Sequence, residues 1–403
     1  MPIRIIRGNS YLLNKVRGES MVALRVYYST RMLGDSSGSG SPSASKPKQV
    51  AKDWLENNFD IDIKPPSPCN RKDMYEAHDK AYVDAVLDAD RTDGFGLKRM
   101  ANIKSFPYTS GAMYAAARYC LKCSQSSCAA LCSGFHHAGW DFGGGYCTFN
   151  GLIIAAMKLK KNGLASKVGI LDLDQHYGNG TDQIINKLRL DYIQHYSAGG
   201  EYSRPDHAKE FLKKLPEIVK KFKGCDIILV QFGADPHIDD PLGGFLTTNQ
   251  LKKRDQIVFQ GCADLNIPVA WNLAGGYQKD KDGGIKPILD IHRNTVITAI
   301  KALKVFKKNR GIRSRFRKKP ISNAPTFGER LIVHSVRFTI KQDRLLSNYV
   351  NMIERNTGEK VTYSWVVNEL INLGVKPFET KHIYHQDLQI EYDGFKDDDD
   401  DEN

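Results

Sequence analysis

The segment that decides the fold is "KVGILDLDQHYGNGT", residues 167–181, in which an apolar run ends in polar side chains. Asp172, Asp174 and His176 stand at alternate positions, and glycines follow them. Alternate residues of an extended chain point to the same side, so Asp174 and His176 can face one point. A buried strand with such an end is typical of a parallel sheet that carries its binding site beyond the carboxyl ends of the strands.

The composition is that of a soluble globular protein. The chain has 403 residues, of which 41% are hydrophobic, so it can bury a sizeable core. No run approaches the 18 or so apolar residues that a membrane helix needs. The formal net charge is +12, and residues 301–319 hold ten Lys or Arg and no acid, which indicates contact with an anionic partner.

Eight cysteines without a secretory signal favour a reducing compartment over a disulfide scaffold. Buried free thiols are the preferred interpretation, and a structural zinc site is the alternative for the four cysteines that lie close together: Cys120, Cys123, Cys128 and Cys132.

Strand-like apolar runs alternate with amphipathic helical patterns from residue 22 to about 306, which predicts one large α/β domain with a mainly parallel sheet. A Ser/Gly/Pro-rich loop is predicted at 35–49, and helices at 49–58 and 111–122. Residues 1–21 form a basic extension, for which a transit peptide, an untidy extension or an early start before Met21 are alternatives. The predicted strands are "ALRVYYS" (23–29), "AALCSGF" (129–135), "KVGILDLD" (167–174), "CDIILVQFGAD" (225–235) and "IPVAWNLAGGY" (267–277).

Four of these strands end in residues of related chemistry. Two carboxylates and one imidazole, from Asp174, His176 and Asp235, would hold a zinc ion with one open position, which is typical of a catalytic site. The pair His136 and His137 could then move a proton. A lone Asp or His would more simply be a helix cap or a satisfied polar group, but the agreement of four strand ends favours a site.

The last strand ends in Gly275, Gly276 and Tyr277. The two glycines permit a close approach of the backbone, and the Tyr277 hydroxyl could donate a hydrogen bond to a developing oxyanion.

Five ordered motifs, "SGFHHAGW", "GGYCTFN", "ILDLDQHYGNGT", "FGADPHIDDPLGGF" and "LAGGY", resemble those of the histone deacetylase family, which includes acetylpolyamine relatives. The resemblance covers residues 22–305. It implies a single arginase/deacetylase-like α/β domain with an eight-stranded parallel sheet flanked by helices, and zinc-dependent hydrolysis of an acetyl-amide.

The resemblance also implies residue roles. Asp174, His176 and Asp235 would be the zinc ligands, and His137 the main general base and acid. The supporting roles would be those of His136 as electrostatic partner, Tyr277 as the hydroxyl that polarises the carbonyl, and Asp172 as the residue that orients His136 near a monovalent-cation (K+) site.

The chain departs from the family pattern at several positions. Asn179 stands where many members have a carboxylate beside the second histidine. Tyr146, which follows Gly145, replaces the usual phenylalanine of the acyl-lysine tunnel. The loop 195–207 is unlike the usual opposite wall, for which Tyr202 is our candidate. No rim aspartate is evident, so either acetyl-lysine or an acetylated polyamine or other small amine is an expected substrate.

Residues 330–379 resemble a ribbon-helix-helix module, a strand followed by two helices. About fifty residues cannot bury their apolar faces alone, so a homodimer is expected. Ser335, Arg337 and Thr339 would face DNA bases, with the linker 307–329 adding electrostatic attraction. The alternative is an appendage that only packs or dimerises. An acidic tail, 380–403, follows.

We therefore expect a zinc-dependent deacetylase. The competing functions are a DNA-binding regulator with an inactive deacetylase-like domain, and a metabolic amidohydrolase without affinity for DNA. An arginase-like enzyme would need a two-metal site with more aspartates and no pair of histidines. The expected location is cytoplasmic, with nucleoid association if the module binds DNA, and organellar targeting remains open.

Overall fold

The computed structural model describes residues 23–35, 37–38 and 41–303. They form an α/β domain whose parallel sheet has seven strands in the order β2-β1-β3-β7-β6-β4-β5. The strands are β1 (Leu24–Tyr27), β2 (Ile61–Lys64), β3 (Ser127–Ala130), β4 (Val168–Asp172), β5 (Ile193–Ser197), β6 (Ile227–Gln231) and β7 (Val269–Asn272).

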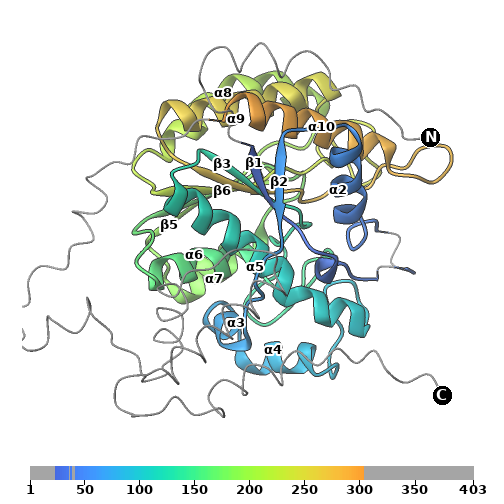
Figure 1. The fold of residues 1–403 in the computed structure, drawn as a ribbon, viewed down its shortest axis with the longest axis vertical. Coiled ribbons are helices and arrows are strands. Elements are labelled where there is room, and N and C mark those ends of the chain that lie inside the picture. The colour runs from blue at the N-terminus through green and yellow to red at the C-terminus, as the bar shows by residue number, and fades with distance from the viewer. Residues whose placement is uncertain (1–22, 36, 39–40, 304–403) are drawn as a thin grey trace, which may run out of the picture. The chain divides into compact units, whose positions relative to one another are not determined.

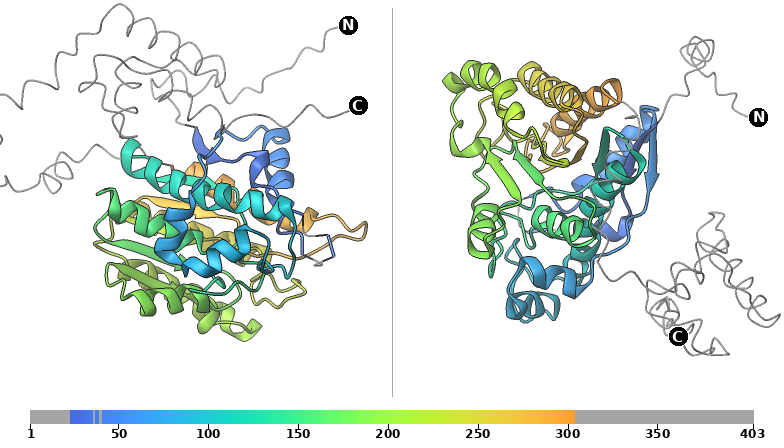
Figure 2. Two further views of the ribbon diagram at one scale, coloured as in Figure 1. Left: turned by 90° about the horizontal axis from the view of Figure 1, so that it is seen from below. Right: turned by 90° about the vertical axis from the view of Figure 1, so that its left-hand side faces the viewer.

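Helices cover both faces of the sheet (Figures 1 and 2). One layer contains α2 (Lys46–Glu56), α8 (Ala208–Lys221), α9 (Thr248–Asp264) and α10 (Lys286–Lys301). The other contains α3 (Arg71–Ala77), α4 (Lys80–Leu87), α5 (Met100–Cys123), α6 (Gly151–Lys161) and α7 (Asn179–Leu188). Short 3-10 turns are η1 (Thr30–Met32), η2 (Ala198–Gly200) and η3 (Pro205–His207).

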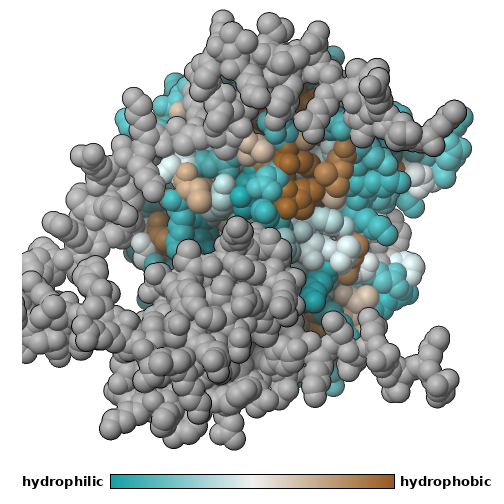
Figure 3. All heavy atoms as spheres, in the orientation of Figure 1, coloured by the Kyte–Doolittle hydropathy of each residue, from teal (hydrophilic) through white to brown (hydrophobic). Residues whose placement is uncertain are grey.

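The central strands are buried on both faces, as their continuous apolar sequences predict. Every residue of β3, β4, β6 and β7 is buried, which is the pattern of a parallel sheet between two helical layers. Edge strand β2 is only partly buried. On the face shown in Figure 3, hydrophilic side chains surround a small hydrophobic patch near the centre of the view.

Several local predictions need correction. The expected strand 129–135 begins earlier, at Ser127, and ends at Ala130, so residues 131–135 are free to turn toward the site. The loop predicted at 35–49 ends sooner, because α2 starts at Lys46 with a proline in its first turn, where the missing N–H costs nothing. The described residues contain seven strands rather than eight.

The cysteines do not form a metal site within the described ranges. Cys120 and Cys123 belong to α5 and Cys128 to β3, and Cys123 is exposed while the other two are buried. The one group of potential metal ligands found among the described residues excludes all eight cysteines. None of the described helices is long and apolar enough to cross a membrane. The predicted C-terminal module, its linker and its tail lie outside the described residues, as does the extension 1–21.

Candidate metal and catalytic site

The site lies beyond the carboxyl ends of the central strands. Asp174 and His176 follow β4, and Asp235 follows β6, so the adjacent pairing of these two strands brings them together. One ligand atom from each residue lies within 4.8 Å of the other two. His176 Nδ1 is 3.2 Å from Asp174 Oδ1 and 3.1 Å from Asp235 Oδ2.

The two carboxylates are buried at 2% and 0% exposure, and this gives the group an unusual electrostatic state. Burial and the nearby Asp174 raise the pKa of Asp235 to about 8. Hydrogen bonds to both carboxylates raise the pKa of His176 to about 10. Buried Asp235 Oδ1 has no hydrogen-bond partner. A divalent cation would relieve the repulsion and satisfy that oxygen, so the three residues fit a metal ion.

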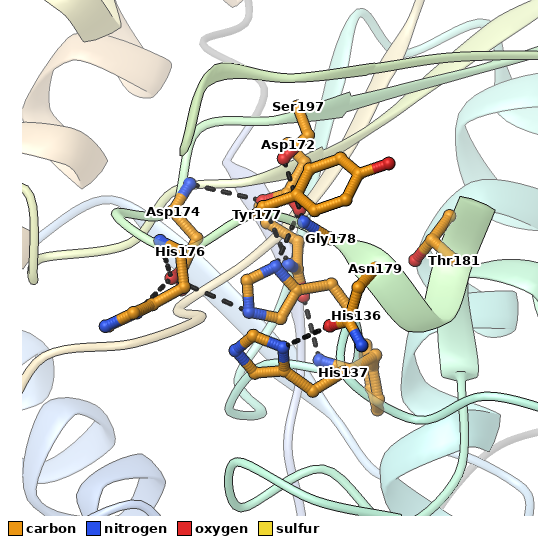
Figure 4. Close-up of polar contacts among 12 residues, drawn as sticks. His136, His137, Asp172, Asp174, His176, Tyr177, Gly178, Asn179, Thr181 and Ser197 are labelled. Carbon is orange, nitrogen blue, oxygen red and sulfur yellow. Dashed lines mark hydrogen bonds and ion pairs between the residues drawn. The ribbon is translucent and has the colours of Figure 1, made fainter. Parts of the chain in front are cut away.

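His136 and His137 reach the site from the segment after β3, and their ring centroids are 4.1 Å apart (Figure 4). His136 Nδ1 donates to Asp172 Oδ2 at 2.6 Å, and His136 Nε2 lies 3.6 Å from Asp174 Oδ1. Burial alone would lower the pKa of His136, but the carboxylates of Asp172 and Asp174 outweigh burial and raise the pKa to about 9. His136 is therefore a cation at neutral pH.

His137 is in the opposite state. Burial and the charge of His136 lower its pKa. Its Nδ1 is 2.7 Å from Asn179 Oδ1, and because an amide oxygen only accepts, Nδ1 carries the proton. The other ring nitrogen, Nε2, is then free to accept a proton, which is what a general base requires.

Tyr277 and Tyr146 form an aromatic wall, with ring centroids 5.6 Å apart, and Phe95 continues it at 5.6 Å from Tyr146. Burial, together with Asp235 and Asp174, raises the pKa of Tyr277, so its hydroxyl stays protonated and can donate. The Tyr277 backbone N–H donates to Asp240 Oδ2 at 2.8 Å, and this bond holds the Tyr277 backbone in place.

The predicted glycines lie where a side chain would not fit. A Cβ on Gly145 would come within 2.4 Å of the His137 ring, and one on Gly275 within 2.3 Å of Asp235 Oδ2. The Gly275 N–H donates to Asp174 Oδ2 at 2.8 Å. Gly276 adopts φ +134°, a conformation that favours glycine.

Tyr202, our candidate for the opposite wall, is 4% exposed, and its ring centroid is 5.1 Å from that of Phe211 and 6.5 Å from that of Phe245. It packs within the apolar core. Tyr146 lies beside Tyr277, and the substrate contacts of Tyr146 and Tyr202 stay predictions.

The sequence reasoning missed the polar residues that support the site. Gln231 donates to Asp172 Oδ1 at 3.1 Å and accepts from the N–H of Phe135 at 2.9 Å. It therefore links β6 to the segment after β3 that carries His136 and His137, which we call the histidine segment. Lys46 donates from α2 to the carbonyl oxygen of Gly275 at 3.0 Å. Gln231 could have been noticed in the sequence, because it is a polar residue in an otherwise apolar strand. The sequence around Lys46 gives no such indication.

Comparison with known proteins confirms the resemblance for part of the chain. Residues 43–198 match the family model described as the histone deacetylase domain. Acetylpolyamine amidohydrolase 2 of Pseudomonas aeruginosa is 53% identical over 177 residues, which cover 37% of this chain and 50% of that protein. Histone deacetylase 2 of Arabidopsis thaliana is 28% identical over 170 residues, which cover 36% of this chain and 43% of that protein.

A solved structure, the HDA15 HD domain, matches 70% of this chain and 90% of its own with a TM-score of 0.59 and 17% identity, so the fold is shared. The chain spans about half the length of the curated relatives that it matches.

Proposed function

Because residues 43–198 carry the histone deacetylase domain, we propose that this protein is a zinc-dependent deacetylase that hydrolyses an acetyl-amide. The observation that carries the proposal is the group of two buried carboxylates and one imidazole beside two adjacent histidines, of which His136 bonds to a buried carboxylate and His137 to an amide oxygen. Acetyl-lysine and acetylated small amines are both candidate substrates, and relatives named acetylpolyamine amidohydrolase favour a small amine.

Asp174, His176 and Asp235 would hold the zinc ion. When bound there, zinc would act as a Lewis acid and lower the pKa of a water molecule toward neutrality. The family resemblance further suggests a monovalent cation near Asp172, which already accepts hydrogen bonds from His136 and Gln231.

The protein's own residues would move the protons. His137 Nε2 would accept a proton from the attacking water, while cationic His136 stabilises the negative charge that develops beside it. The Tyr277 hydroxyl would donate a hydrogen bond to the carbonyl oxygen of the acetyl group. Protonated His137 would then return its proton to the leaving amine, and the half-buried aromatic wall would limit access of bulk water.

The test is turnover of acetylated substrates by the purified chain. Tyr277→Phe removes one hydrogen bond at the oxyanion and should lower kcat by roughly 10²- to 10³-fold without changing the zinc content. A panel of acetyl-lysine peptides and acetylpolyamines, each measured with and without chelator, would identify the substrate class. Unchanged turnover by the Phe variant would refute the role of Tyr277, and chelator-insensitive turnover would refute zinc dependence.

A DNA-binding function of the C-terminal module remains a prediction. Its residues Ser335, Arg337 and Thr339, and the expected homodimer, lie outside the described residues. Salt-dependent binding to duplex DNA would support it.

A further inference from the structure

Arg254 in α9 is a fully buried arginine that touches both segments on which the proposed metal ligands lie. Its Nη1 donates to the carbonyl oxygen of Leu173 at 3.2 Å and to that of Gly233 at 2.8 Å. Leu173 directly precedes Asp174, and Gly233 lies two residues before Asp235. One guanidinium nitrogen therefore bridges the chain after β4 and the chain after β6.

The other side of the guanidinium is held in place by its own helix and by α10. Arg254 Nε donates to Asp255 Oδ1 at 2.9 Å, and Asp255 Oδ2 accepts from the Thr295 hydroxyl at 2.6 Å. All three residues are at most 1% exposed. The Phe232 ring packs 5.4 Å from the guanidinium carbon. Because the guanidinium is planar and is fixed from several directions, it can hold two carbonyl oxygens at a defined separation.

Net stabilisation does not explain this buried pair. Removing two ionised groups from water costs about as much as their attraction returns, and an apolar pair of similar volume is often equally stable or more stable. The two carbonyl groups, however, lie in the segments beyond the strands, where they need a donor. Arg254 supplies it next to Asp174 and Asp235, whose side chains must face one point to share a metal ion.

We propose that Arg254 is a positioning residue that sets the spacing of Asp174 and Asp235 and thereby the affinity of the site for its metal ion. The inference rests on the proposed function, because it concerns the same three ligands. Without the bridge, the carbonyl groups of Leu173 and Gly233 would lose their common donor, and the two ligand segments would be free to move apart. Loss of a supporting contact of this kind weakens metal affinity by roughly 10- to 100-fold.

The experiment separates positioning from stability. The double variant Arg254→Met/Asp255→Leu replaces the ion pair by an apolar pair, and Arg254→Lys keeps the charge but loses the planar fork. We expect the double variant to fold with some loss of stability, because two carbonyl groups lose their donor, and to bind zinc at least tenfold more weakly in a chelator competition with the full chain. Arg254→Lys should weaken zinc binding less, and the Co2+ form of both variants should show an altered visible spectrum.

Arg293→Lys is the matched control. Arg293 in α10 donates to Asp53 Oδ2 at 2.8 Å, away from the ligand segments, so zinc affinity should not change. A double variant that folds and binds zinc as tightly as wild type would overturn the proposal. If the double variant fails to fold, wild-type affinity and spectrum in Arg254→Lys would overturn it instead. Failure of the wild-type chain itself to bind zinc would refute the proposed function, and with it this inference.

Discussion

Two adjacent histidines differ in their bonding partners and in the charges around them. Burial opposes the charge of both rings, but the carboxylates of Asp172 and Asp174 outweigh it at His136 and raise its pKa to about 9. At His137, which bonds to the neutral Asn179, burial and the charge of His136 lower the pKa. The sequence departure at Asn179 is therefore compatible with catalysis, because the amide oxygen still selects the tautomer of His137.

Asn179 should be needed for its hydrogen bond and not for its lack of charge. We expect Asn179→Ala to lower kcat by roughly tenfold or more, because His137 loses its orienting acceptor, with zinc content unchanged. Asn179→Asp keeps an acceptor at the same place and should retain more activity than Asn179→Ala. Steady-state kinetics with zinc analysis checks both, and equal activity of Asn179→Ala and wild type would contradict the assignment.

At the scale of elements, the strands whose runs are continuously apolar were predictable. The strands β4, β6 and β7 lie within the ranges that the sequence predicted, because burial on both faces leaves an uninterrupted apolar pattern. The strand β1 also lies within its predicted range, although its residues alternate between buried and partly buried. The edge strands β2 ("IDIK") and β5 ("IQHYS") were missed, because each carries polar residues and only partial burial. Sequence pattern alone does not separate such strands from loops.

The site was predictable where its residues follow strands, and not where they come from helices. The topology brings Asp174, His176 and Asp235 to one edge, as their positions after strands indicated. Lys46 and Arg254 approach that edge from helices far away in sequence. Their contacts depend on how the helices pack on the sheet, which no local pattern encodes.

His78, which follows the last residue of α3, gives a pH-dependent prediction. Its Nδ1 lies 2.8 Å from the carbonyl oxygen of Gly139, and its Nε2 accepts from the N–H of Asn150 at 2.8 Å, so the neutral ring joins the histidine segment to α6. Burial lowers the pKa of His78 from 6.5 to about 4. The unfolded chain therefore binds more protons between pH 6.5 and 4, and stability falls as the pH falls through that window.

The full effect is on the order of 3 kcal/mol below pH 4 and is absent above pH 6.5. His78→Asn keeps a donor for Gly139 but cannot take up the proton. We expect this variant to be less stable at pH 7 and to lose less stability than wild type between pH 7 and 4.5 in urea unfolding experiments. Parallel pH dependences of the two proteins would show that His78 does not contribute.

At the scale of the whole described domain, the fold buries two neighbouring carboxyl groups at one edge of the sheet. Asp174 and Asp235 are both buried there, and Gly275 allows the backbone to approach them closely. Such an arrangement costs stability unless a cation binds. The domain should therefore be markedly more stable with its metal ion than without it.

This coupling predicts how zinc changes thermal stability. Zinc at 100 times its dissociation constant stabilises a native state that binds it by about 2.7 kcal/mol, if the unfolded chain does not bind. For a domain of this size the gain corresponds to a rise in Tm of roughly 5 °C. Asp235→Asn replaces a buried carboxyl group, whose ionisation is opposed by burial and by Asp174, with a neutral amide that is a poor zinc ligand. Its metal-free form should therefore be at least as stable as metal-free wild type, and zinc should raise its Tm little. Thermal unfolding of both proteins, with zinc and with chelator, checks the coupling.

The contrary outcome is a metal-free Asp235→Asn variant that unfolds at a much lower temperature than metal-free wild type. In that case the Asp235 carboxyl group would stabilise the fold by itself, and its burial at this edge of the sheet would carry no cost for a metal ion to offset.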